Sequence, residues 1–426
     1  MKKEEDIFKM YSDMDEMLES IDLDKQNDTK SANNISKIDI SDMPDFSLNT
    51  EEKNALNEQE LTPSTYENKK DEIDVSNDLV KEKQKHKKRK QKKNSKGWVV
   101  TFAILDALAI ICLFLMYGPI SYFRNLWVTS AMTTMSHKYL AYVFFNQNQI
   151  NYIMSNNNII EVEGETNQEE IEFENKEEQI QYSSIYEEQV LKRDPGNDLY
   201  KVIDIEGNGY KGHMLVVYDP SKIHLVKTPS FSYGLTIEQF VEKNNAIAGI
   251  NAGGFNYSDG YGYTPTGVMI IDSEIICDNG STGWGGGIIG FTNDDVLVLT
   301  KASANEAINM GIRDAVSFGP FLIVNGVASE FTGNGGYGIA PRTAIGQRKD
   351  GIVLMLVIDG RRAGHSLGVD MVELTNIMLN YGAYNASNLD GGGSSTIVVE
   401  GETLSIAGGY GYTGDRYLPN AWLLEG

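Results

Sequence analysis

The chain has 426 residues, with 60 Asp and Glu against 37 Lys and Arg and a formal net charge of −23. This length allows more than one domain. Its two cysteines, Cys112 and Cys277, exclude a disulfide scaffold and a cysteine-rich zinc site.

The N-terminal region divides into an acidic part and a basic part. Residues 1–80 are rich in Asn, Ser, Glu and Lys and poor in aromatic residues. Such a segment cannot bury enough apolar surface to offset chain entropy, so we expect it to be disordered. Residues 81–96 hold ten Lys or Arg against one Glu. A basic block can bind nucleic acid, but an apolar segment follows directly, so we expect no nucleic-acid partner.

Residues 97–118 are expected to form a transmembrane signal anchor. Trp98 to Tyr117 is a run of mostly apolar residues long enough to cross a bilayer as a helix. It lies too far from the N-terminus for a cleaved signal peptide. The positive-inside rule then places residues 1–96 in the cytoplasm, with the basic block next to the membrane, and all later residues outside. This predicts a single-pass type II protein of the plasma membrane.

Residues 119–197 are expected to connect the anchor to a folded domain. The stretch 120–145 mixes apolar and polar residues at helical spacing and predicts a membrane-proximal helix. Residues 155–190 are acidic and rich in Gln and Asn, which favours a tether that holds the next domain off the membrane.

Residues 198–426 predict an α+β domain, a mixed sheet of hairpins with a few packed helices. Short β runs alternate with glycine-rich turns, and no repeat of 20–50 residues recurs. The predicted strands and strand pairs are 199–205, 213–218, 222–227, 246–251, 268–277, 287–300, 316–325, 343–359, 384–390, 396–400 and a run ending at 424. The predicted helices are 236–245, 304–311 and 370–381.

Two motifs place a carboxylate at the end of an apolar strand and follow it at once with glycine. The first is Asp359-Gly360-Arg361, and the second is Asp390-Gly391-Gly392-Gly393-Ser394-Ser395. Glycine allows the sharp turn and exposes backbone N–H groups to an anion. These parts suit a site that holds a sugar and a phosphate together.

Other turns are candidates of lower specificity. Asn251, Gly253 and Gly254 end a buried strand, where they either contact a ligand or form a tight structural turn. Arg342 opens a strand, and a guanidinium matches phosphate oxygens. His365 could shuttle a proton, but an exposed loop histidine is the favoured interpretation. Motifs of serine hydrolases, P-loop NTPases, zincins and EF-hands are absent from the sequence.

Taken in order, these turns resemble the motifs of the phosphodiester glycosidase family. The resemblance spans residues 198–426 and rests on 251–255, Gly319-Pro320, 342–346, 359–361 and 388–395. It implies hydrolysis of a sugar-1-phosphate diester. In this reading Asp390 and Asp359 are the nucleophile and base, in either order. Substrate-binding residues are then Arg342, Arg361 and the Gly391, Gly392 and Gly393 amides for phosphate, Asn251 and Ser394 for sugar hydroxyls, with Gly253, Gly254 and Ser395.

The expected substrate is a phosphorylated glycan of a bacterial cell surface or an exopolysaccharide. The abundance of Lys, Asn and Ile is what indicates a bacterial origin. Two alternatives remain open. One is a non-catalytic module that binds phosphate-containing wall glycans through the same residues. The other is a phosphodiesterase that uses a divalent cation, Ca²⁺ or Mg²⁺, held by the two aspartates.

Overall fold

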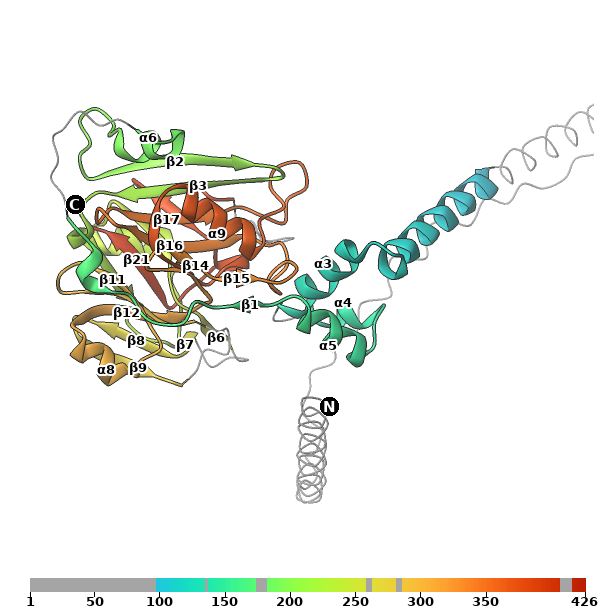
Figure 1. The fold of residues 1–426 in the computed structure, drawn as a ribbon. Coiled ribbons are helices and arrows are strands. Elements are labelled where there is room, and N and C mark those ends of the chain that lie inside the picture. Colours follow the sequence, from blue (N-terminus) through green and yellow to red (C-terminus); the bar gives the residue numbers. More distant parts are fainter. Residues whose placement is uncertain (1–96, 135–136, 174–181, 258–262, 281–285, 407–415) are drawn as a thin grey trace, which may run out of the picture. The chain divides into compact units, whose positions relative to one another are not determined.

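The structure is a computed structural model that describes residues 97–134, 137–173, 182–257, 263–280, 286–406 and 416–426 (Figure 1). The predicted disordered tail and basic block, residues 1–96, lie outside these ranges. Gly97–Tyr117 is one helix whose length and mean hydropathy of 2.7 would let it cross a membrane. This helix coincides with the predicted span.

Most of the chain after residue 198 folds into three antiparallel sheets. A seven-stranded sheet has the order β14-β13-β18-β16-β17-β3-β2, and two five-stranded sheets have the orders β11-β10-β12-β8-β9 and β20-β19-β5-β21-β4. The strands of the seven-stranded sheet are β2 (Tyr200–Gly207), β3 (Tyr210–Val217), β13 (Phe321–Val324), β14 (Val327–Ala328), β16 (Arg342–Arg348), β17 (Val353–Ile358) and β18 (Ala383–Asn388).

The other two sheets are built from shorter strands. The first comprises β8 (Val268–Ile271), β9 (Glu274–Asp278), β10 (Gly287–Thr292), β11 (Leu297–Thr300) and β12 (Ile312–Phe318), and the second comprises β4 (Ile223–Lys227), β5 (Ala248–Asn251), β19 (Ile397–Val399), β20 (Glu402–Thr403) and β21 (Asn420–Leu424). Two small ladders pair β1 (Ile159–Ile160) with β15 (Glu330–Phe331), and β6 (Phe255–Tyr257) with β7 (Tyr263–Pro265).

The other helices in the described ranges are short. They are α3 (Ser121–Met132), α4 (Tyr139–Tyr142), α5 (Gln147–Ser155), α6 (Ile185–Leu191), α7 (Ile237–Asn244), α8 (Ala304–Asn309) and α9 (Met371–Asn380), with 3-10 turns at Gln168–Glu170, Pro220–Lys222 and Gly392–Ser394. Thr236 is the N-cap of α7, because its side chain accepts a hydrogen bond from the Gln239 amide.

The core lies between the three sheets and on the far face of the seven-stranded one. Along β17, Met355 and Val357 pack in the cluster shared with the other two sheets, whereas Leu356 and Ile358 pack in the cluster that includes residues of α9. Both faces of the strand are therefore buried, which is why its sequence is continuously apolar rather than alternating. Such a strand holds the residues that follow it in fixed positions.

The structure confirms the predicted α+β class and corrects two details. Residues 316–325 were expected to be a strand pair, but β12 belongs to a five-stranded sheet and β13 to the seven-stranded one. The chain passes between the sheets at Gly319-Pro320, a cis peptide. The single helix expected over 120–145 is instead α3 and α4, followed by α5, with a break after Met132.

The expected tether contains a stretch that packs on the domain. The amide of Thr166 donates to the Leu299 carbonyl, and Ile171 is buried in the cluster that includes residues of α8. Val190 on α6 is fully buried against the seven-stranded sheet. These contacts tie parts of residues 159–191 to the domain. The domain boundaries at 119 and 198 stay a prediction.

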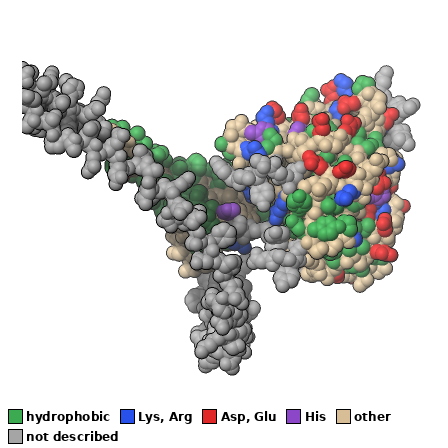
Figure 2. Space-filling model, turned by 180° about the vertical axis from the view of Figure 1, so that it is seen from behind, with side chains coloured by type: hydrophobic (Ala, Val, Ile, Leu, Met, Phe, Trp, Pro, Cys, Tyr) green, Lys and Arg blue, Asp and Glu red, His purple; other side chains and the backbone are tan. Residues whose placement is uncertain are grey.

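Figure 2 shows one face of the domain formed by the sheets. Acidic, basic and apolar side chains are intermingled on that face, and no broad patch there carries charge of one sign only.

Candidate functional site

The predicted site residues converge because the two strands that flank β16 end where β16 begins. In the seven-stranded sheet β16 lies between β17 and β18 and runs antiparallel to both, with Arg342 opposite Ile358 and Ala344 opposite Asn388. The turns after β17 and β18 therefore reach the same edge of the sheet as the start of β16. This edge gathers Asp359, Arg342 and Asp390.

Asn251 joins the second five-stranded sheet to this edge. Its side-chain Nδ2 donates to the Asp390 carbonyl, and its Oδ1 accepts from Thr343 Oγ1 at 2.8 Å and from the Thr396 amide at 3.1 Å. Asn251 is buried, and both ends of its amide are engaged with protein. The geometry supports the structural reading of this residue, which fixes the turn after β18.

The glycine turn after Asp390 lies against two arginines. A Cβ at Gly392, where φ is +65°, would sit 3.3 Å from Arg361 Nη2, and one at Gly393 would sit 3.9 Å from Arg416 Cδ. Arg416 also donates to Ser394 Oγ at 3.0 Å and lies over the Phe255 ring, 4.8 Å from its centroid. Arg416 is a site residue that sequence reasoning missed, since no motif surrounds it.

The site arginines lie close enough together that the charge of one lowers the pKa of another. Burial of the guanidinium away from water, and then the charge of Arg416, lower the pKa of Arg361. Burial, and then the charge of Arg361, lower the pKa of Arg342 to about 10. Three guanidinium groups that repel one another near a glycine turn form an electropositive edge that an anion would relieve.

Asp390 stands beside this positive edge in an environment that disfavours its charge. Burial of the carboxyl raises its pKa, while the nearby Arg416 and a hydrogen bond from Ser394 work in the opposite direction. The carboxyl therefore holds its proton to a higher pH than an ordinary aspartate, a property suited to proton transfer.

Asp359 carries a histidine. Its Oδ2 lies 2.7 Å from His365 Nε2, and its Oδ1 accepts from the Ile406 amide at 2.9 Å. Asp359 is buried, whereas the His365 ring remains about a third exposed. The loop interpretation of His365 missed this pairing, although a histidine six residues after a strand-end aspartate was a usable signal.

Arg342 uses its guanidinium on the protein itself. Nη2 donates to the carbonyls of Tyr337 at 2.9 Å and Gly338 at 2.7 Å, and Nε donates to the Val369 carbonyl at 3.2 Å. These bonds hold the loop before β16, which favours a positioning role over direct phosphate binding.

The remaining candidates have mainly packing environments. A Cβ at Gly253 would lie 2.9 Å from the Val316 side chain, and one at Gly254 would lie 2.8 Å from the Phe318 ring. These glycines are required for close packing of β5 against β12. Ser395 Oγ is buried and makes no hydrogen bond within the described residues.

The donor set does not fit a divalent cation. Across the described ranges, no group of three or more His, Cys, Asp or Glu side chains is gathered closely enough to hold a metal ion. Asp359 has both carboxylate oxygens engaged, and two sheet spacings, about 10 Å, separate the strands that carry the two aspartates. The reaction proposed below therefore uses protein side chains and water.

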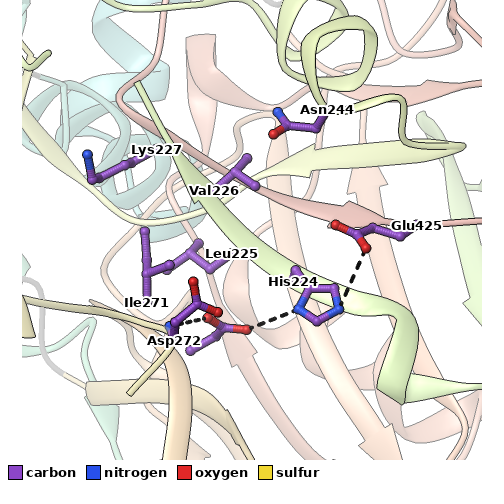
Figure 3. A pocket seen from close by; sticks show the side chains of 9 residues that line it. His224, Leu225, Val226, Lys227, Asn244, Ile271, Asp272 and Glu425 are labelled. Carbon is purple, nitrogen blue, oxygen red and sulfur yellow. Dashed lines mark hydrogen bonds and ion pairs between the residues drawn. The ribbon is translucent and has the colours of Figure 1, made fainter. Parts of the chain in front are cut away.

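A hollow elsewhere on the domain contains none of the predicted site residues. It is lined by residues of β4 and β12, among others, and includes His224 (Figure 3). His224 Nδ1 lies 3.6 Å from Asp314 Oδ2, and Nε2 lies 3.9 Å from Glu425 Oε2. The Asp314 carboxylate raises the pKa of His224, against the effects of burial and of the neighbouring Arg313.

Comparison with known proteins matches residues 244–425 to the family model described as phosphodiester glycosidase. Over 177 residues the chain is 29% identical to the SPbeta prophage-derived uncharacterized protein YomE of Bacillus subtilis (strain 168), covering 40% of this chain and 27% of that protein. It is 24% identical over 244 residues to the N-acetylglucosamine-1-phosphodiester alpha-N-acetylglucosaminidase of Mus musculus, covering 52% and 45%. The chain thus spans less than half the length of these relatives.

A solved structure of the catalytic domain of the zebrafish N-acetylglucosamine-1-phosphodiester alpha-N-acetylglucosaminidase, auto-inhibited by its pro-peptide, is similar with a TM-score of 0.46 and 18% identity, over 55% of this chain and 85% of that chain. The family match covers all five motifs of the resemblance, from Asn251 to Ser395. The match over residues 244–425 confirms the predicted resemblance of this part of the chain to the phosphodiester glycosidase family.

Proposed function

We propose that this domain hydrolyses the bond between the anomeric carbon of a sugar and the phosphate of a glycosyl phosphodiester. The observation that carries the proposal is the turn Asp390 to Gly393, which sets a carboxyl of raised pKa beside Arg361 and Arg416. A phosphodiester glycosidase needs positive charge for the departing phosphate and a proton-transfer group at the anomeric bond.

The phosphate would lie against Arg361, Arg416 and the amides of the glycine turn. A departing phosphate gains negative charge, so guanidinium groups placed beforehand stabilise the transition state more than the ground state. Arg342 acts behind them, because its donors are engaged with the carbonyls of Tyr337, Gly338 and Val369. We therefore propose Arg416, rather than Arg342, as a direct phosphate contact, with Arg342 in a positioning role.

The two aspartates take different roles in this proposal. Asp390 protonates the phosphate oxygen as the bond breaks, which suits a carboxyl with a raised pKa. Asp359 orients His365 through its 2.7 Å contact, and His365 takes a proton from the attacking water.

The substrate and location are part of the same proposal. The relatives named N-acetylglucosamine-1-phosphodiester alpha-N-acetylglucosaminidase make an α-N-acetylglucosaminyl phosphodiester the first substrate to test. The apolar helix Gly97–Tyr117, behind a basic block, supports a type II anchor with the domain outside the cell. Surface glycans or exopolysaccharides that contain phosphodiesters would then be within reach.

The test uses the full chain in detergent with this substrate in ¹⁸O-labelled water, with and without chelator. Label in the sugar, independent of chelator, is the expected result. Label in the phosphate would mean cleavage of the P–O bond and a phosphodiesterase. Saturable binding of the substrate without any product would mean a binding module.

Two variants connect the result to the site. Asp390→Asn should abolish sugar release, whereas Asp198→Asn, which changes an exposed carboxylate paired with Arg193, should leave it unchanged. Equal turnover in both variants would remove Asp390 from the reaction.

A further inference from the structure

The loop that leads into β16 lies between the proposed site and the helices that follow the apolar span. This loop, residues 332–341, contains the sequence Gly-Asn-Gly-Gly-Tyr-Gly at 333–338. At its C-terminal end Pro341 O accepts from the Gly392 amide at 2.8 Å, and Arg342 donates back to the carbonyls of Tyr337 and Gly338. The loop is therefore in direct contact with the glycine turn of the site.

Helix α3 holds the same loop from the other side. Asn334 Nδ2 donates to Thr129 Oγ1 at 2.8 Å, and Thr133 Oγ1 donates to the Tyr337 carbonyl at 3.2 Å. The Tyr337 carbonyl thus accepts from Thr133 on α3 and from Arg342 on β16. One backbone oxygen links the helix to the arginine.

The residue that follows α5 and its cap completes the contact. The amide of Asn334 donates to Asn157 Oδ1 at 3.2 Å, and Asn157 is buried, with its Nδ2 donating to the Ile153 carbonyl at 2.8 Å. The helices and the loop thus share hydrogen bonds in both backbone and side chain.

The glycines of the loop are required by this packing. A Cβ at Gly338, where φ is +61°, would lie 2.7 Å from the Ser130 Cα, and one at Gly336, where φ is +82°, would lie 2.4 Å from the Asn157 carbonyl oxygen. Atoms do not approach so closely, and positive φ is strained for other residues. The loop sequence therefore matches the surface of α3 and the end of α5.

We propose that α3 and α5 form the outer support of the proposed active site, in which Thr129, Thr133 and Asn157 are positioning residues that hold the loop 332–341. Through that loop they fix Arg342 and the Gly392 amide. The inference rests on the proposed function, and it assigns a role in the site to a segment outside the family match of residues 244–425.

The supporting helices are also continuous with the apolar span. Met116 at its end is buried in one cluster with Val128 of α3 and Ile150 of α5. Residues 118–120 alone separate the apolar helix from α3. An anchored chain would therefore hold its membrane segment close to the helices that contact the loop.

The test compares full-length variants by hydrogen exchange and by kinetics. Thr129→Val with Thr133→Val keeps the shape of both side chains and removes both hydroxyls that contact the loop. We expect faster exchange of amides in residues 334–342 and a several-fold rise in KM for the glycosyl phosphodiester, with a smaller change in kcat. Serine at both positions should restore both values.

The matched control is Thr134→Val. Thr134 Oγ1 donates to the Ala131 carbonyl at 2.8 Å and accepts from the His137 amide, so its loss perturbs the same helix end without removing these loop contacts. Asn334→Ala removes the hydrogen bond to Thr129 from the loop side. This variant replaces the double variant in the same measurements if the double variant does not fold. Exchange in 334–342 that stays as in the unmodified chain, or rises equally in Thr134→Val, would overturn the proposal. Because exchange needs no turnover, it separates this outcome from a failure of the proposed hydrolysis.

Discussion

His365 Nε2 lies 2.7 Å from Oδ2 of the buried Asp359, and the other face of that carboxylate is held by the Ile406 amide. A carboxylate fixed in this way sets the orientation and tautomer of the ring. If the ring takes a proton from water, His365→Gln should lower kcat by about 100-fold or more with little change in KM. Steady-state kinetics between pH 5 and 8 measure this effect.

The domain offers a matched control for that histidine. His213 Nδ1 lies 3.0 Å from Asp204 Oδ1 on the β2–β3 hairpin, which is a similar pair outside the site. His213→Gln should leave kcat unchanged. A similar loss of kcat in both variants would assign the effect of His365→Gln to folding rather than to catalysis.

Arg416 is expected to contribute to phosphate affinity. Arg416→Gln removes the charge beside the glycine turn and the hydrogen bond to Ser394. Because a charge-assisted contact is worth about 1.5–3 kcal/mol, KM for the phosphodiester should rise by about 10-fold or more. Titration of the substrate under steady-state conditions measures it.

Arg193→Gln is the control for this change. Arg193 lies over the Tyr218 ring, 4.5 Å from its centroid, much as Arg416 lies over Phe255. It precedes β2 and is paired with the exposed Asp198. An unchanged KM in Arg416→Gln would exclude this arginine from phosphate binding.

Asp390→Asn should separate stability from activity. Burial raises the pKa of Asp390, so ionisation is less favourable in the folded chain than in the unfolded one. The favourable contribution of this group is full below the unfolded pKa of about 3.9 and is lost as pH rises through the higher folded value. At neutral pH the asparagine variant should therefore melt at the same temperature or higher, while it releases no sugar. Thermal melts at pH 3.5 and pH 7 test the sign, since a variant that loses stability only at pH 7 contradicts it.

Strand-end motifs were predictable from the sequence because their signal is local. The apolar strand before Asp359 and the glycines after Asp390 fall within a few residues of one another, and the structure has the expected strands ending at Ile358 and Asn388. The two motifs come together because β17 and β18 both lie antiparallel beside β16. The sequence predicted hairpins but not this strand order.

Long-range partners were not predictable in the same way. Arg416 donates to Ser394, which lies 22 residues earlier in the chain. The side-chain oxygen of Asn251 accepts hydrogen bonds from Thr343 and Thr396. No rule of sequence spacing indicates either contact. Glycines of residues 333–338 have positive φ values and lie against α3 and the residues after α5, and no sequence pattern predicted this contact. Tertiary contacts of this kind have no short-range sequence pattern.

Asn251 should prove structural. Asn251→Ala removes hydrogen bonds to Asp390, Thr343 and Thr396 and leaves buried polar groups unsatisfied, at a cost of about 3 kcal/mol in the free energy of unfolding. Denaturant titration measures this loss. Asn244→Ala, which removes one bond to the Phe240 carbonyl on helix α7, should cost about 1 kcal/mol or less. Similar losses in the two variants would contradict the central role of Asn251.

His224 gives a pH dependence that is separate from the site. The Asp314 carboxylate raises the pKa of His224, with Glu425 acting in the same direction and burial and Arg313 opposing. Its contribution to stability is full below the unfolded pKa of about 6.5 and is lost as pH rises through the higher folded value. Between pH 6 and pH 8 the Tm of the wild-type protein should therefore fall further than the Tm of the His224→Gln variant. The difference between the two curves isolates this histidine from His213 and His365, and parallel curves would show that protonation of His224 does not join β4 to β12.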